Sequence, residues 1–312
     1  MKKLITALLI ASASALIMTG CSSTPPITGT YTDDNGTVLT IAAATNGIVI
    51  TYTETDANKT DARYFVQPAP SDPITGIHPV VGINVGLASV NPAAYRGWKG
   101  ACPGTEIDAW FMETLLTSYD HPTTTLYNSQ ATDTGIIAAC SNALPSIVRN
   151  GLIILTISGH GSRTRDISGD ETDGQDEQLC LWNGKYTDDK VWIQLNRIHT
   201  SRPDVRILMI SDTCHSGSNY RAGPIHLAPG IRARATDTQV APNLLHFGGC
   251  SDSALSYGSS QGGVFTTALI DAFDTTLTYR QWFCAASALM PKNQRPTMES
   301  TGISFADKPI FK

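Results

Sequence analysis

Residues 205–218 read VRILMISDTCHSGS, and this stretch decides the fold. Its first half is a short apolar run, which predicts a buried strand over residues 205–211. Its second half consists of small polar residues, which indicates that the chain leaves the core there and turns. Cys214 is therefore expected just beyond the carboxyl end of a strand, where open α/β sheets place their ligands.

Residues 152–162 follow the same pattern, because the apolar run LIILTIS leads into His160 between two glycines. If the two strands are neighbours and parallel, Cys214 and His160 leave the sheet at the same edge. A cysteine becomes a strong nucleophile where a base favours its thiolate, and histidine can act as that base. His215 is a rival base, although the direct neighbour of a nucleophile usually points elsewhere. Each residue alone is more often a packing or surface residue, but the shared context favours a Cys–His pair.

The rest of the main pattern alternates strands with helices. This alternation predicts an α/β fold with a largely parallel central sheet and helices on both faces. Long loops are expected at residues 161–177 and 217–243. The further strands expected are residues 79–84, 123–127 and 244–249, and the helices expected are residues 105–118, 134–148, 188–198, 263–273 and 280–289.

The first residues have the pattern of an export signal. Lys2 and Lys3 precede an apolar run over residues 4–18, and Cys21 follows a small residue. This arrangement resembles a bacterial lipoprotein signal, with residues 1–20 removed and Cys21 lipidated. Ser22 after the cysteine favours the outer membrane over the inner one in a host that has two. An uncleaved apolar anchor and a plain signal peptide are the alternatives.

Three further segments complete the predicted organisation. Residues 21–27 are expected to form a tether, residues 28–55 a small β element, and residues 56–76 a polar, Pro-containing linker. Residues 77–312 then form the main α/β domain. The formal net charge of −5 gives no support to nucleic-acid binding. The seven cysteines lie too far apart in sequence for a zinc motif or a disulfide framework.

Three motifs together carry a family resemblance. Residues 158–162 read SGHGS, residues 169–177 read GDETDGQDE, and residues 212–217 read DTCHSG. With weaker supporting motifs between residues 79 and 297, they resemble the metacaspase and bacterial caspase-like branch of the caspase-fold peptidases. The resemblance implies a caspase-like fold and a cysteine endopeptidase that acts on protein or peptide substrates, mostly as a monomer and without an organic cofactor.

The resemblance also implies roles for particular residues. Cys214 corresponds to the nucleophile and His160 to the base, and the backbone N–H groups of Cys214 and Gly161 correspond to the oxyanion hole. Asp212 and Ser158 each lie two residues before a member of the pair. Residues at i and i+2 of a strand share a face, so both side chains are expected beside the nucleophile.

In metacaspases an aspartate and a serine at these places receive basic P1 side chains. Asp108 loosely matches a second aspartate of that pocket, in the first helix, although it is also an ordinary first-turn acid. The sequence therefore predicts cleavage after Arg and then Lys. Arg163 and Arg165, close to His160, argue against this prediction.

The acidic loop suggests a calcium site through the same resemblance. The candidate ligands are Asp176, Asp188 and Asp189, whereas the aspartate expected soon after the catalytic cysteine is missing, because residues 219–221 read NYR. Calcium prefers six to eight oxygen ligands, so this loss weakens the site. A solvated acidic turn is the alternative.

Two further hypotheses concern the whole protein. If the enzyme prefers Arg, the loop at residues 217–243 can be self-cleaved at Arg221, Arg232 or Arg234. The alternative to an enzyme is a catalytically silent caspase-like lipoprotein that binds or scaffolds in the envelope. The intact Cys–His pair argues against that alternative.

Overall fold

The computed structural model describes residues 74–166, 173–220 and 241–312, together with short strands nearer the N-terminus. The chain divides into a small N-terminal unit and a larger unit that begins at Ala62. In the small unit, β1 (Gly29–Thr32) pairs antiparallel with β2 (Val38–Ala44), and β3 is Gly47–Thr53. A two-residue strand, β4 (Ala62–Arg63), falls inside the predicted linker. Residues 1–28, including Cys21 and the predicted signal and tether, lie outside the described residues.

The larger unit is built on a six-stranded sheet with the order β15-β12-β11-β7-β5-β6. Every neighbouring pair is parallel except β12 with β15, so the predicted largely parallel sheet is confirmed. The six strands are β5 (His78–Gly86), β6 (Thr123–Tyr127), β7 (Ile147–Ser158), β11 (Arg206–Asp212), β12 (Asn243–Gly248) and β15 (Thr297–Thr301).

The register of the two central strands positions the site. Strand β7 pairs with β11 from Leu152 opposite Arg206 to Ser158 opposite Asp212. Both strands run in the same direction, so both carboxyl ends reach the same edge of the sheet. The chain leaves β7 toward His160 and β11 toward Cys214 from directly opposite residues.

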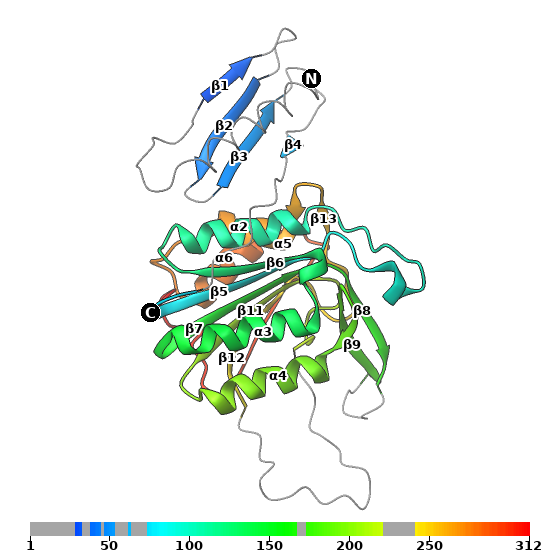
Figure 1. The fold of residues 1–312 in the computed structure, drawn as a ribbon, viewed down its shortest axis with the longest axis vertical. Coiled ribbons are helices and arrows are strands. Elements are labelled where there is room, and N and C mark those ends of the chain that lie inside the picture. The colour runs from blue at the N-terminus through cyan, green and yellow to red at the C-terminus, as the bar shows by residue number, and fades with distance from the viewer. Residues whose placement is uncertain are drawn as a thin grey trace, which may run out of the picture. The chain divides into compact units, whose positions relative to one another are not determined.

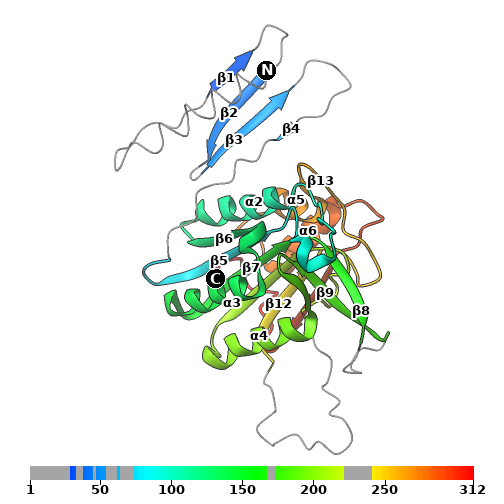
Figure 2. The same ribbon diagram turned by 45° about the vertical axis from the view of Figure 1, so that its right-hand side comes forward.

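Helices cover both faces of the sheet, as predicted (Figures 1 and 2). Alternate residues of β11 point to opposite sides: Ile207 and Met209 belong to one apolar cluster, and Leu208 and Ile210 belong to the other. The first cluster includes side chains of α3 (Asp133–Ala143) and α4 (Asp188–Ser201). The second includes side chains of α2 (Thr105–Thr117), α5 (Val264–Asp271) and α6 (Tyr279–Leu289). No helix within the described ranges is long and apolar enough to span a membrane.

One predicted helix ends earlier than the sequence pattern suggested. The pattern predicted a helix over residues 134–148, but α3 ends at Ala143 and a 3-10 turn over Leu144–Ser146 follows. Strand β7 already begins at Ile147. Pro145 is the physical cause, since it has no backbone N–H to donate and clashes with a preceding helical turn.

The described part of the predicted loop at residues 161–177 lies mostly in strands. It contains β8 (Gly161–Arg165) and the start of β9 (Gln175–Leu181), which pair antiparallel. With β10 (Gly184–Thr187) they form a three-stranded sheet in the order β10-β9-β8. The pattern hid these strands because β9 buries acidic and amide side chains, such as Glu177 and Gln178, where burial normally selects apolar ones.

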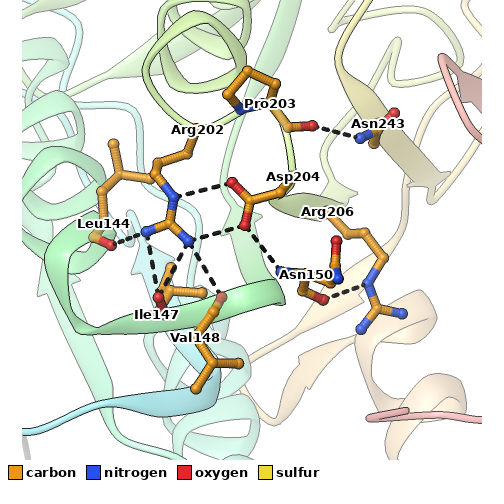
Figure 3. Close-up of polar contacts among 9 residues, drawn as sticks. All are labelled: Leu144, Ile147, Val148, Asn150, Arg202, Pro203, Asp204, Arg206 and Asn243. Carbon is orange, nitrogen blue, oxygen red and sulfur yellow. Dashed lines mark hydrogen bonds and ion pairs between the residues drawn. The ribbon is translucent and has the colours of Figure 1, made fainter.

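At the amino ends of β7 and β11, an ion pair in the segment before β11 is hydrogen-bonded to the chain around the start of β7 (Figure 3). The guanidinium of Arg202, at the C-terminus of α4, donates to both carboxylate oxygens of Asp204 at 3.1 and 3.0 Å. Asp204 also accepts the backbone N–H of Asn150 at 2.9 Å. Arg202 further donates to the backbone carbonyls of Leu144, Ile147 and Val148.

Candidate active site

Cys214 lies in a sharp turn just after β11. The next residue, His215, has a φ of +53°, and its N–H donates to the carbonyl of Ala254 at 3.1 Å. The half-buried thiol of Cys214 donates to the carbonyl of Ser256 across 3.8 Å. Burial raises the pKa of this thiol, and the nearby Asp212 carboxylate raises it further. The resting group is therefore a thiol, and it needs a base to become a thiolate.

The loop over residues 250–256 holds this turn in place. Cys250 donates its N–H to the hydroxyl of Ser216 at 3.1 Å, and Asp252 accepts the N–H of Ser218 at 2.7 Å. The imidazole of His215 donates from Nδ1 to the carbonyl of Asp252 at 2.5 Å. A backbone carbonyl only accepts, so this contact occupies a ring nitrogen of the rival base.

A loop that precedes α2 orients the ring of His160. Its Nε2 lies 3.1 Å from the carbonyl oxygen of Ala101, and the ring of Trp98 packs against it with centroids 5.0 Å apart. Since a carbonyl can only accept, Nε2 carries the proton and donates it. In the neutral ring Nδ1 then has the free lone pair, which is the form that a general base requires.

Gly161 connects the histidine motif with the cysteine motif. A Cβ placed on Gly161 would overlap the carbonyl oxygen of Cys214 and lie 3.2 Å from its nitrogen. The backbone after His160 therefore packs directly on the backbone of Cys214, and only glycine permits this approach. The histidine motif and the cysteine motif therefore meet where the backbone of Gly161 contacts the backbone of Cys214.

A pair of buried carboxylates, Asp108 and Asp212, lies beside the cysteine turn. Asp212 accepts the hydroxyl of Ser256 at 2.6 Å, and it accepts both the N–H and the hydroxyl of Thr266 at 2.9 Å. Asp108, from α2, accepts the hydroxyl of Ser158 at 2.5 Å and the N–H of Gly263 at 2.7 Å. The structure thus gathers the three residues that the sequence suggested for a substrate pocket.

No cationic side chain in the described part of the chain neutralises the two carboxylates. Their partners among the described residues are hydroxyl and backbone N–H groups only. Burial and the proximity of Asp212 raise the pKa of Asp108 to about 8, and burial also raises the pKa of Asp212. Two carboxyl groups this close and this buried resist ionising together, and a cation placed beside them would relieve that cost. Such a site favours a cationic ligand.

The carboxylate pair is closed off from solvent in this structure. Side chains of Asp108 and Asp212 are 1% and 6% exposed, and the cavity beside them measures about 10 Å³. Two short strands, β13 (Gly258–Ser259) and β14 (Gly262–Gly263), form a hairpin next to them. A Cβ on Gly263 would overlap a carboxylate oxygen of Asp212. Gly263 therefore covers the pair, and a side chain as large as arginine requires movement there.

Arg163, whose positive charge near His160 spoke against a basic P1 side chain, forms an ion pair away from the two carboxylates. Its guanidinium forms an ion pair with Asp173 at 3.6 Å, within the β8–β9 region. Arg165, at the end of β8, is exposed. The structure thus shows neither arginine in an ion pair with Asp108 or Asp212.

The acidic candidates for calcium lie on β9 and at the start of α4. Asp188 accepts the N–H groups of Glu177 and Asp189 at 3.3 and 2.9 Å, so both of its oxygens have partners. Burial, followed by the charges of Glu177 and Asp176, raises the pKa of Asp188 to about 8. In the described part of the chain, no three His, Cys, Asp or Glu side chains are grouped to hold a metal ion. Calcium binding by Asp176, Asp188 and Asp189 therefore stays a prediction from the family resemblance.

Sequence reasoning missed three residues of this site: Ser256, Thr266 and Gln294. Ser256 and Thr266 contact Asp212, and Gln294 contacts Ser256. Thr266 ends a supporting motif of the family resemblance, but that motif gave it no role. No motif marked Ser256 or Gln294, which lie in a loop and in the turn before β15, far from Cys214 in sequence. None of the six cysteines in the described ranges forms a disulfide.

Comparison with known proteins gives consistent matches. A family model described as "Caspase domain" (Peptidase C14) matches residues 89–305. Metacaspase-1A of Aspergillus clavatus is 34% identical over 105 residues, which cover 33% of this chain and 24% of the relative. Metacaspase-1 of Yarrowia lipolytica is 26% identical over 200 residues, which cover 47% and 42% of the two chains. The chain thus spans less than half the length of these curated relatives.

Among solved structures, one Geobacter sulfurreducens protein is similar over most of the larger unit. The crystal structure of this protein aligns with a TM-score of 0.61 at 29% sequence identity. The alignment covers 75% of this chain and 98% of the other.

Proposed function

This chain belongs to the caspase domain family, and on that premise we propose that it is a cysteine endopeptidase that cleaves after Arg and, more slowly, after Lys. The observation that carries the proposal is the buried pair of carboxylates beside the Cys214 turn, which has no cationic partner in the described ranges. A P1 guanidinium supplies the missing positive charge with a planar set of donors that matches a carboxylate.

In the proposed reaction, His160 takes the proton of Cys214 Sγ through Nδ1, and the sulfur attacks the scissile carbonyl carbon. The resulting oxyanion accepts the backbone N–H groups of Cys214 and Gly161. His160 then returns the proton to the leaving amine as the carbon–nitrogen bond breaks. Water hydrolyses the remaining thioester. The hydrogen bond from His160 Nε2 to Ala101 supports this role, because it leaves Nδ1 as the base.

Substrate entry requires a change beside the carboxylates. The hydrogen bond from the Gly263 N–H to Asp108 must break before a guanidinium reaches the pair. We infer that the β13–β14 hairpin moves on binding, since it carries Gly263 and two of its four residues are exposed. The incoming guanidinium replaces the lost backbone donor.

The proposed reaction uses only the thiol, the imidazole and backbone donors, so it requires no organic cofactor. Calcium at Asp176, Asp188 and Asp189 stays a prediction from the family resemblance, and no step is assigned to it. The prediction is tested by measuring the cleavage rate with calcium and with a chelator, and equal rates would contradict it.

We also propose that lipidated Cys21 anchors the protein to a bacterial cell envelope, at the outer membrane of a host with two. The support is the pattern of residues 1–22 alone. Metabolic labelling with a fatty acid tests this proposal: wild-type protein is expected to carry the label and Cys21→Ala protein is not. Label on both proteins, or on neither, would contradict it.

Fluorogenic peptides that differ only at P1 test the proposed activity. The expected order of kcat/KM is Arg, then Lys, with Asp far slower, and Cys214→Ala removes the activity. Labelling of the thiol by an Arg-based peptide probe, absent in Cys214→Ala, checks the nucleophile. Faster cleavage after Asp would refute the P1 assignment. Absence of both cleavage and labelling would favour the catalytically silent envelope module.

A further inference from the structure

Gln294 makes three hydrogen bonds beside the active site although it lies in the turn between α6 and β15. Its side chain is 2% exposed. The Nε2 atom donates to the carbonyl of Gly249 at 2.9 Å and to the hydroxyl oxygen of Ser256 at 2.8 Å. The Oε1 atom accepts the N–H of Tyr257 at 3.1 Å. All polar atoms of this buried amide are therefore engaged with the loop that follows β12.

The partners of Gln294 set the direction of each bond. The N–H of Tyr257 can only donate and the carbonyl of Gly249 can only accept, which determines which way the amide faces. The hydroxyl oxygen of Ser256 therefore accepts from Gln294, and its one hydrogen points at Asp212, 2.6 Å away. Two hydrogen bonds therefore run in one direction, from Gln294 to Ser256 and from Ser256 to Asp212, and we call this pair of bonds the relay.

The same relay reaches the nucleophile through the backbone. The carbonyl of Ser256 accepts the thiol of Cys214, so one residue contacts both the carboxylate and the sulfur. Gln294 holds Ser256 at its hydroxyl and holds the next residue, Tyr257, at its N–H. Gln294 thereby restrains the segment that touches Asp212 and Cys214.

We propose that Gln294 is a positioning residue that sets the preference for a charged P1 side chain, acting through Ser256 on the Asp212 carboxylate. This inference rests on the proposed function, because it assigns Asp212 to the P1 pocket. Without the donated hydrogen of Ser256, Asp212 keeps only its two bonds from Thr266. A carboxylate with fewer donors is protonated more readily and attracts a cation less strongly.

A pair of substrates with P1 Arg or P1 citrulline tests the relay, because the two side chains have nearly the same shape but differ in charge. Gln294→Met removes the donor to Ser256 without adding charge. Without this donor the Ser256 hydroxyl is free to turn its hydrogen away from Asp212. The ratio of kcat/KM for Arg to that for citrulline is expected to fall by up to about tenfold, the effect of losing the hydrogen bond from Ser256 to the charged carboxylate. Gln294→Glu is expected to lower the ratio as well, although its charge alone would raise it.

The pH profile gives a second readout that a purely structural role would not move. The titratable groups facing Asp212 are Asp108 from α2, Cys102 from the preceding loop, and Cys214. All three are present in wild type and variant, so the comparison isolates Asp212. In Gln294→Met the acidic limb of kcat/KM for the Arg substrate is expected to move to higher pH.

The matched control is Gln281→Met, which changes an exposed glutamine that caps the start of α6. It is expected to leave the Arg-to-citrulline ratio unchanged. In a Ser256→Ala background, Gln294→Met is expected to add nothing to the loss of ratio, because the relay is already broken. If Gln294→Met does not fold, Ser256→Ala alone tests the same relay from its other end.

Equal losses for both substrates, or an unchanged ratio, would overturn the inference while leaving the peptidase assignment intact. If the wild type cleaves neither substrate, the proposed function fails instead. The relay is then tested by calorimetry, which measures the binding of butylguanidine to Cys214→Ala protein with and without Gln294→Met. Binding about tenfold weaker on adding Gln294→Met supports the relay, and equal or absent binding rejects it.

Discussion

The two ends of strands β7 and β11 differ in how their charged side chains are paired. At the amino ends, Arg202 and Asp204 face each other in a two-pronged ion pair (Figure 3). At the carboxyl ends, Asp108 and Asp212 lie together with only neutral donors around them among the described residues. The Arg202 guanidinium lowers the pKa of Asp204, whereas burial and the neighbouring acid raise the pKa of Asp108. The same strands thus carry a compensated and an uncompensated charge.

This difference suits two roles, a structural one for the ion pair and the proposed P1-binding one for the two acids. A compensated pair joins two chain segments, and nothing further needs to bind there. Two buried acids whose described neighbours include no cation disfavour folding above the pKa of an ordinary carboxyl group, so we expect a ligand to supply the positive charge. The comparison predicts that changes at the carboxyl ends affect catalysis and P1 preference, and that changes at the amino ends affect stability.

Gly161→Ala is expected to have the largest effect, on catalysis. The added methyl group overlaps the carbonyl of Cys214 and displaces an oxyanion-hole donor, so kcat is expected to fall by about 10²–10³. Gly159→Ala is the matched control on the other side of His160, where the new Cβ lies 3.2 Å from the Leu87 side chain. It is expected to lose at most a few-fold of kcat. Similar losses in the two variants would show that Gly161 has no special place in the site.

Asp212→Asn is expected to have the next largest effect, on charge recognition. The variant keeps the size of the side chain but removes the negative charge, so the Arg-to-citrulline ratio of kcat/KM is expected to fall about a hundredfold. The measurement uses the two peptides at a pH above 8, where the wild-type pair is most fully ionised. A ratio equal to that of wild type would place P1 recognition elsewhere.

Asp108→Asn is expected to change the pH dependence of stability. In the folded protein the pKa of Asp108 is raised to about 8, against about 3.9 for a free aspartate. Its contribution is therefore fully present at low pH and is lost as the pH rises from about 4 to about 8. The stability of the variant relative to wild type is expected to increase by roughly 1 to 4 kcal/mol between pH 5 and pH 8.

Urea unfolding of both proteins at several pH values measures this difference. A gap between wild type and Asp108→Asn that stays constant with pH would mean that Asp108 keeps an ordinary pKa in the folded state. The rate of cleavage of an Arg substrate cannot replace urea unfolding here. The charge of Asp108 affects both substrate binding and folding, so the rate would not separate the two.

Arg202→Met is expected to have the smallest effect in this series and to leave P1 preference unchanged. It removes a partly buried partner of Asp204 and several bonds to carbonyls, so unfolding free energy is expected to fall by about 2 kcal/mol. Because Arg202 lowers the pKa of Asp204, this stabilisation is present above the ordinary aspartate pKa and is lost at lower pH. Arg280→Met, at the exposed pair with Asp307, is the control and is expected to change the unfolding free energy far less, because water screens that pair.

Much of the α/β unit could be predicted because its strands are plain apolar runs. Residues 152–158 and 205–211 are buried on both faces, so nearly every residue there is apolar and the run is visible without a partner. Strands β8 and β9 were missed for the opposite reason: their residues are largely polar, and their pairing is stabilised by contacts from distant segments. The helix predicted to Val148 failed where one proline outweighed the local pattern.

The sequence alone determined the central elements of the fold and pointed to Cys214, His160, Gly161, Ser158, Asp108 and Asp212, because each lies next to a strand end or in a short motif. Only the tertiary structure revealed Ser256, Thr266 and Gln294 as the groups that hold Asp212, and Gly263 as the residue that covers it. Their role depends on the direction of individual hydrogen bonds between segments far apart in the chain. Directions of that kind exist only once the chain has folded.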